Sequence, residues 1–164
     1  MQNSLHEILA YILLRSEQIL HRKGLSKYRI TKLVYLCDWC YACACDKQIT
    51  SIHWFFDNYG PFVWDITNTL TQDQNLFSSN IVLDPLGNKI TSFSINCLDY
   101  KPNIEPSIQD CMEYVLQNAV GLPRQEFTNL VYATYPIKTS RRYTSLNLLE
   151  KAQEYKKMKK RSVI

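Results

Sequence analysis

Residues that interrupt regular structure are scarce in this sequence, which has only four glycines and six prolines among 164 residues. The glycines are isolated, so the chain lacks a Gly-rich phosphate-binding loop. Internal repeats and low-complexity segments are lacking too. The most apolar stretch near the N-terminus covers only residues 8–14 and has charged neighbours on both sides, so it predicts neither a membrane span nor a secretory leader. These absences favour one compact domain with a sizeable core.

A disulfide framework is not expected either, because the six cysteines occur in a chain without a recognisable leader and reduced thiols are typical of the cytoplasm. Cys37, Cys40 and Cys43 have the CxxCxxC spacing of iron–sulfur loops, and Cys45 follows them. On a helix, however, Cys37 and Cys43 lie about 120° apart around the axis and about 9 Å apart along it. We therefore predict core and surface thiols, with no metal and no cofactor. Metal binding and redox sensing are the minor alternatives.

Candidates for catalysis are sparse. A nucleophilic thiol or hydroxyl needs a base placed beside it, and the histidines stand in no recognisable catalytic string, so we predict a protein without enzymatic activity. A Cys/His pair formed in three dimensions is a minor alternative. Four neighbouring carboxylates are neither paired for acid–base work nor spaced like a calcium loop, which predicts solvated faces and helix caps. The histidines are His6, His21 and His53, and the carboxylates are Asp38, Asp46, Asp57 and Asp65.

The net charge of +4 is unevenly distributed. Residues 151–164 contain six basic side chains and one acidic side chain, so they carry +5 and the first 150 residues carry −1. This indicates a nearly neutral domain over residues 1–150 and a basic C-terminal helix end or tail over residues 151–164. Basic side chains near the first interhelical turn and in the tail are weak candidates for phosphate contacts. They are Arg22, Lys23, Lys27, Lys156, Lys157 and Lys160.

Hydrophobic periodicity predicts a mainly helical α+β domain of about six helices with one small β-hairpin or short antiparallel sheet. Ser26 is expected to cap the second helix, and Pro61 to open the third, with Trp64 on the inner face of that helix. A short strand is expected at residues 49–56, and a hairpin at residues 80–95. The expected helices cover residues 5–20, 26–44, 61–70, 106–120, 123–132 and 145–158.

The element order in the first two thirds of the chain is helix, helix, strand, helix, hairpin. This is also the order of a winged helix-turn-helix, in which the third helix enters the major groove of DNA. The third predicted helix offers Asp65 and no lysine or arginine, which disfavours base reading by that helix. A nucleic-acid-binding regulator is therefore the alternative function and not the leading one.

Aromatic residues are unusually dense between residues 39 and 64, and part of this set is expected in the core. Any rings left exposed near the turn at residues 58–61 would form a rigid surface of the kind that anchors protein–protein contacts. The candidate partner-binding residues are Trp54, Phe56, Tyr59, Gly60, Pro61 and Trp64.

Three segments together resemble the Panacea domain, also called the SocA-like antitoxin domain. Residues 32–36 read KLVYL, Ile49 and Thr50 follow a short polar turn, and residues 59–61 read YGP. The family typically has a "KLLYL" helix and a strand that ends in "YGP". The segments at residues 130–136 and 148–149 fit its layout more loosely.

The resemblance implies an antitoxin-type protein of bacteria, prophages or other mobile elements that binds and neutralises a toxin encoded nearby. In one branch of the family the toxin is delivered to a protease, and some members have no toxin partner, so a stand-alone phage role is a further alternative. No enzymatic activity is implied. Physically, Gly60 permits a backbone angle or close approach that other residues do not. The motif is therefore expected to fix local architecture, and it is also a candidate for shaping a partner surface.

Overall fold

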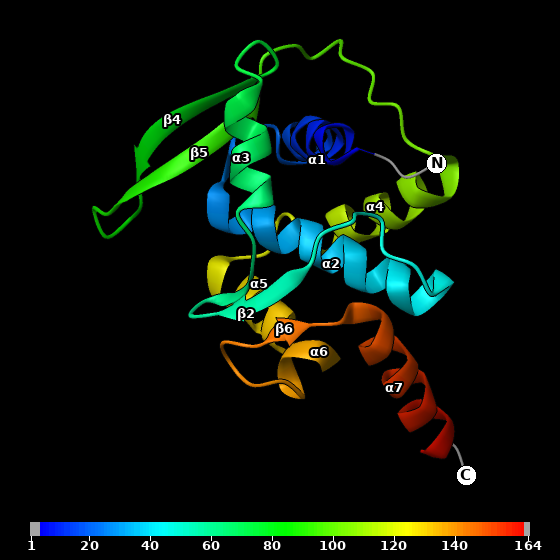
Figure 1. Cartoon of the computed structure of the whole chain (residues 1–164). Coiled ribbons are helices and arrows are strands. Elements are labelled where there is room, and N and C mark those ends of the chain that lie inside the picture. The colour runs from blue at the N-terminus through cyan, green and yellow to red at the C-terminus, as the bar shows by residue number, and fades with distance from the viewer. Residues whose placement is uncertain (1–3, 163–164) are drawn as a thin grey trace.

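The computed structural model describes residues 4–162, and within them the chain forms an α+β fold of seven helices and six short strands (Figure 1). Residues 1–3 of the predicted domain and residues 163–164 of the predicted tail lie outside this range. The helices are α1 (Leu5–Leu20), α2 (Lys27–Cys45), α3 (Asp65–Gln72), α4 (Pro106–Ala119), α5 (Arg124–Tyr132), α6 (Tyr135–Lys138) and α7 (Leu148–Arg161). The strands are β1 (Leu25–Ser26), β2 (Trp54–Asp57), β3 (Gly60–Phe62), β4 (Phe77–Leu83), β5 (Lys89–Ile95) and β6 (Ser145–Leu146).

The first two helices begin at serine caps. The hydroxyl of Ser4 accepts a hydrogen bond from the Glu7 N–H, and that of Ser26 accepts one from the Arg29 N–H, which confirms the predicted cap of α2. α2 is the central helix, because α1, α4 and α7 all pack against it. Its side chains are buried without interruption over residues 30–38. This burial on nearly all sides explains why α2 shows little amphipathic pattern beyond its predicted apolar stripe.

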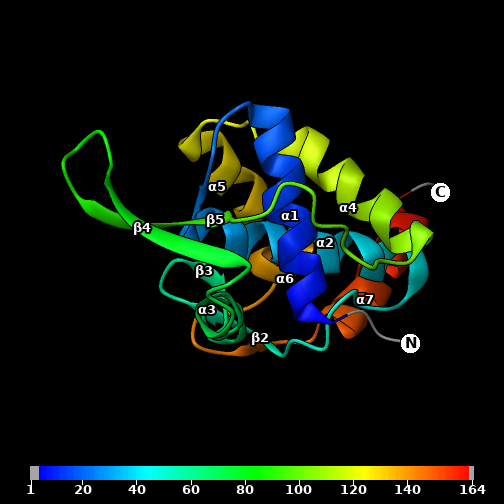
Figure 2. The ribbon, with the colours of Figure 1, turned by 90° about the horizontal axis from the view of Figure 1, so that it is seen from above.

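Two three-stranded antiparallel sheets flank the helices. In the first, β1 and β4 pair on either side of β5, and the β4–β5 hairpin confirms the predicted hairpin. In the second, β3 and β6 pair on either side of β2. In Figures 1 and 2 the distal half of the β4–β5 hairpin projects away from the helices, whereas the β2–β3 hairpin lies against the body of the protein.

The structure corrects two predicted helix starts. Pro61 does not open a helix, because residues 60–62 pair with β2 as a strand, and α3 begins only at Asp65. Trp64 is therefore the N-cap of α3 and is 64% exposed, so its predicted position on an inner face was wrong. The last helix begins after Asn147, whose side chain accepts from the Glu150 N–H, because Ser145 belongs to β6.

The strand content was underestimated. One hairpin was predicted, and the second sheet was missed because two of its strands are only two or three residues long and one comes from far along the chain. The β2–β3 hairpin also enters between α2 and α3, where the winged-helix order has no such element. The structure therefore does not confirm the winged-helix order. Within residues 4–162 no helix has the length and hydrophobicity needed to cross a bilayer.

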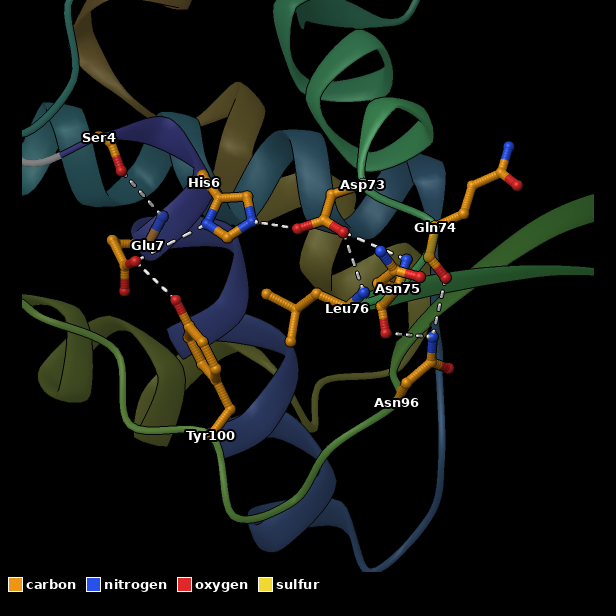
Figure 3. A network of polar contacts seen from close by, with 9 residues as sticks. All are labelled: Ser4, His6, Glu7, Asp73, Gln74, Asn75, Leu76, Asn96 and Tyr100. Carbon is orange, nitrogen blue, oxygen red and sulfur yellow. Dashed lines mark hydrogen bonds and ion pairs between the residues drawn. The ribbon is translucent and has the colours of Figure 1, made fainter.

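A polar network ties the start of α1 to two distant segments (Figure 3). The His6 ring contacts the Asp73 carboxylate at 2.8 Å, next to the junction of α3 and β4, and this hydrogen bond lowers the pKa of Asp73. Glu7 accepts hydrogen bonds from the Tyr100 hydroxyl at 2.6 Å and from the Asn103 N–H at 2.8 Å. The first turn of α1 thus holds both ends of the β4–β5 unit in place.

Candidate functional site: the β2–β3 hairpin surface

A buried lysine of α2 anchors the β2–β3 hairpin. Lys32 is 2% exposed, and its Nζ donates a hydrogen bond to the Pro61 carbonyl at 2.8 Å and lies 4.8 Å from the centre of the Tyr28 ring. Desolvation lowers the pKa of Lys32 to about 8, and the nearby Asp57 carboxylate opposes this shift. The first residue of the KLVYL segment therefore holds the last residue of the YGP segment.

Gly60 is required at the turn by its backbone angle and not by lack of space. Its φ is +99°, in the region that residues with a side chain rarely adopt. A Cβ at this position would lie 3.5 Å from the Tyr132 ring and 3.7 Å from Lys32 Cε, which are ordinary contact distances. The architectural role expected for this glycine is thus accounted for by its conformation.

A second buried charge, Asp38, fixes the segment that leads into β2. This carboxylate is fully buried and accepts hydrogen bonds from the Thr50 N–H at 2.9 Å, the Trp54 indole N–H at 2.8 Å and the Gln48 amide at 3.2 Å. Burial raises its pKa to about 6, and the hydrogen bonds from Thr50 and Trp54 oppose the shift. The prediction of a solvated or capping role was therefore wrong for Asp38, because its partners come from a loop folded over α2.

On this anchored base the hairpin displays aromatic rings beside cations. Tyr59 is 76% exposed at the turn, and Trp64 is exposed just beyond β3. Lys27 Nζ lies 4.9 Å from the centre of the Trp64 ring, and the guanidinium of Arg124 lies 5.0 Å from that of Tyr28. A hollow of about 460 Å³ lies between α2, α5 and the turn. We call this region the hairpin surface, and it consists of Lys27, Tyr28, Tyr59, Trp64, Arg124 and Tyr132.

Of the six candidate partner-binding residues, the structure leaves only Tyr59 and Trp64 exposed. Trp54 is 1% exposed because its indole is directed at Asp38, and Phe56 is buried with its ring centre 6.3 Å from that of Tyr132. Both were wrongly chosen as contact residues, and they support the hairpin from inside. Gly60 and Pro61 are also buried. The sequence pattern missed Tyr28, Arg124 and Tyr132, because the fold brings them to the turn from α2 and α5.

The weak nucleic-acid candidates do not form one patch. Arg22 and Lys23 are exposed near the N-terminal end of α2, whereas Lys156 on α7 pairs with Asp46, the C-cap of α2, at 2.7 Å. Because α2 has 19 residues, these two groups are separated by roughly 28 Å along its axis. The Nζ of Lys27 lies over the rings of Phe62 and Trp64 in cation–π contacts. Lys157 and Lys160 are exposed on α7.

The cysteines are free thiols, as predicted. Cys37 is buried, Cys45 and Cys97 are exposed, and residues 37–45 are helical, so the sulfurs do not converge as on a cluster-binding loop. In the part of the chain that the structure describes, no three His, Cys, Asp or Glu side chains are grouped as a metal site requires.

A larger apolar groove of about 980 Å³ lies between α2, α4, α5, α6 and α7. Its walls include Trp39, Leu130, Tyr155 and the 65% exposed Tyr114. Pattern reasoning missed this groove because five separate helices contribute to it. The groove is a second candidate surface for partner binding, besides the hairpin surface.

These features define the chain as a mixed α+β protein in which buried charges of a central helix hold a short hairpin, and the hairpin displays aromatic rings. Residues 30–136 match the family model described as "Antitoxin SocA-like, Panacea domain". The matched range covers well over half of the chain, includes Lys32, Gly60 and Pro61, and confirms the resemblance noted from the sequence. The protein belongs to this family. Comparison with curated proteins and with solved structures gave no match.

Proposed function

We propose that this protein is an antitoxin-type binding module that has no chemistry of its own and neutralises a toxin encoded nearby by gripping it with the hairpin surface. Its membership of the SocA-like antitoxin family supports the general role. The observation that carries the proposal is the exposure of Tyr59 at the turn, and of Trp64 just beyond β3, on a hairpin that buried Lys32 anchors.

The physical case rests on preorganisation. Large aromatic side chains bury much area with few rotatable bonds, and they dominate protein–protein contacts when the backbone beneath them is fixed. Tyr59 and Trp64 meet both conditions, and the neighbouring Lys27 and Arg124 add positive charge. The complementary toxin surface is therefore expected to combine an apolar pocket with carboxylates around it.

The free thiols are consistent with action in the cytoplasm, where a toxin from the same mobile element or prophage would also be made. Neutralisation has two forms that differ in the fate of the toxin. Occlusion of its active surface leaves the toxin long-lived in the complex, whereas delivery to a protease shortens its half-life. A pulse-chase of the toxin with and without this protein separates the two.

Co-expression with each neighbouring gene is the direct test. A neighbour that arrests growth alone, and no longer does so when this protein is present, is the expected result, together with a complex on gel filtration. If no neighbour is toxic, or a toxic neighbour is neither rescued nor bound, the proposal is wrong.

The surface is tested with Tyr59→Ala and Trp64→Ala. Because both side chains are exposed, each variant should keep its thermal stability while binding weakens at least tenfold. Tyr114→Ala is the matched control, since Tyr114 is similarly exposed but lines the apolar groove between α2, α4, α5, α6 and α7. Loss of binding in Tyr114→Ala with full binding in the two hairpin variants would move the interface to that groove.

A nucleic-acid-binding regulator is the alternative, and it has less support. α3 has no lysine or arginine, and the only charged residues of the projecting hairpin between residues 80 and 90 are Asp84 and Lys89. Of the candidate basic residues, Arg22 and Lys23 lie near one end of α2 and Lys156 lies at the other. Duplex DNA binding that weakens steeply as salt rises would favour this alternative over the antitoxin role.

A further inference from the structure

The projecting β4–β5 hairpin has a free edge. β4 is an end strand of its sheet, so its outer side pairs with no other strand in the described part of the chain. Its distal residues are apolar and exposed, with Ile81 at 71% and Leu83 at 67%. Natural edge strands are usually protected by lysine, proline or a bulge. β4 reads FSSNIVL, and it contains neither a charged residue nor a proline.

The hydrogen bonds at the two ends of the hairpin show which residues face outward. The Asn96 N–H donates to the Leu76 carbonyl at 2.7 Å, and the Asp84 N–H donates to the Asn88 carbonyl at 2.9 Å. In an antiparallel pair the two polar groups of one residue point to the same side, and successive residues alternate. Because the register is continuous from one end to the other, the even-numbered residues of β4 face β5.

The odd-numbered Ser79, Ile81 and Leu83 therefore direct their N–H and C=O groups to the outer edge. Water reaches these exposed groups, and the protein element that matches such a row of alternating donors and acceptors is another extended strand. All three residues are exposed, so neither α3 nor any other described element covers this part of the edge. The free edge therefore suits a β-strand as its partner.

We propose that this strand is β4 of a second copy of the protein, paired antiparallel across a twofold axis at Ile81. Ile81 then faces Ile81 of the second copy, and Ser79 faces Leu83 in both directions. The three outward residues of each copy form about six backbone hydrogen bonds, and the sheets join as β1-β5-β4-β4-β5-β1. This inference does not depend on the proposed function.

Three observations favour a second copy over another partner. β4 is uncharged, so two copies meet without like-charge repulsion. Ile81 lies at the centre of the outward row, where a twofold axis places its exposed side chain against the same side chain of the other copy. The twofold contact also occupies the free edge of β4 in both copies, and the free distal edge of β5 carries Lys89, which opposes the addition of a further strand there.

The test is sedimentation equilibrium over a hundredfold dilution series. Wild-type protein should show reversible association between 19.3 kDa and twice that mass. Ile81→Pro should weaken the dimer at least tenfold, because proline removes an outward N–H without breaking the β4–β5 ladder. The matched control is Lys89→Pro, because Lys89 lies on the opposite edge of the same hairpin and its N–H also points away from β4, so this variant should dimerise like wild type.

Ile81→Lys is a second variant in case the proline disturbs the hairpin. It places two ammonium groups face to face at the axis, so its association should be weaker than that of wild type and should recover partly at high salt. A wild-type protein that remains a monomer at the highest concentration overturns the proposal. Equal dissociation in Ile81→Pro and Lys89→Pro also overturns it. A monomer that loses toxin binding only in Ile81→Pro would assign the edge to a strand of the toxin and would reject the second copy.

Discussion

The two hairpins of this protein are held in opposite ways. β2–β3 rests on the buried charges Lys32 and Asp38 of α2, and its exposed side chains stand on a fixed backbone. The distal part of β4–β5 projects from the body (Figure 2). Its apolar side chains are exposed, and its outer edge is free in the described part of the chain. Buried polar anchors suit a hairpin to presenting a rigid side-chain surface, whereas a free edge suits it to pairing through its backbone.

The largest effect expected on the anchored side is that of Asp38→Ala. Removal of the carboxylate leaves the buried Thr50 N–H and Trp54 indole N–H without their partner, which should cost about 3–4 kcal/mol of unfolding free energy. Denaturant unfolding followed by tryptophan fluorescence measures this loss. Asp65→Ala is the control, and it should cost less than about 1 kcal/mol because Asp65 is exposed in the first turn of α3. Similar losses in both variants would contradict an anchoring role for Asp38.

The second effect is a pH dependence that comes from Lys32. Its pKa in the folded protein is about 8, below the ordinary 10.5, so the unfolded chain binds the proton more tightly between these values. Stability should therefore rise as pH increases through this window. Relative to Lys32→Met, which cannot titrate, the wild type should gain about 3 kcal/mol between pH 8 and 10.5.

Paired denaturant titrations at several pH values measure that difference. Lys27→Met is the control, because it removes the same ammonium group from a partly exposed position above Trp64. A difference between the wild type and Lys32→Met that stays constant with pH would show that Lys32 is not held in the low-dielectric position seen here.

Gly60→Ala should have the third largest effect, about 1–2 kcal/mol. The cost arises from forcing a residue with a side chain to φ +99°, since the added methyl group meets only ordinary contacts. Because the turn carries Tyr59, partner binding should weaken together with stability. Normal binding at reduced stability would show that the turn conformation does not position Tyr59.

Part of this architecture could be predicted from the sequence because it depends on local signals. The serine cap of α2 and the β4–β5 hairpin follow from neighbouring residues, and the KLVYL and YGP segments identified the family. Local signals failed at Pro61, which also suits the first turn of a helix. In the structure Pro61 pairs with β2 and therefore belongs to a strand.

The rest depends on contacts between distant segments. β6 completes the second sheet from about 90 residues beyond β2, and no local pattern announces a two-residue strand. Trp54 was predicted to lie on the surface, because its hydrogen bond to Asp38 forms only when the intervening loop folds over α2. The hairpin surface was likewise found only in part, since Tyr28 and Arg124 are brought to Tyr59 by the packing of α5 beside α2.

The smallest effect should come from Gly87→Ala, which repeats the glycine substitution in the projecting hairpin. Gly87 also has a positive φ, +84°, but nothing lies within 4 Å of an added Cβ. Because the loop at residues 84–88 is exposed and carries no buried anchor, the strain can be relieved by local fraying. We expect a loss below about 1 kcal/mol in global unfolding.

Amide hydrogen exchange distinguishes the two glycine variants. In Gly87→Ala, faster exchange should be confined to the hairpin tip around residues 82–90, whereas in Gly60→Ala it should extend into β2 and the segment over Asp38. A Gly87→Ala variant as unstable as Gly60→Ala would mean that the projecting hairpin is coupled to the core as tightly as the anchored one. Pairing of β4 with a second copy would supply such coupling, so the comparison should be made both below and above the concentration at which the protein dimerises.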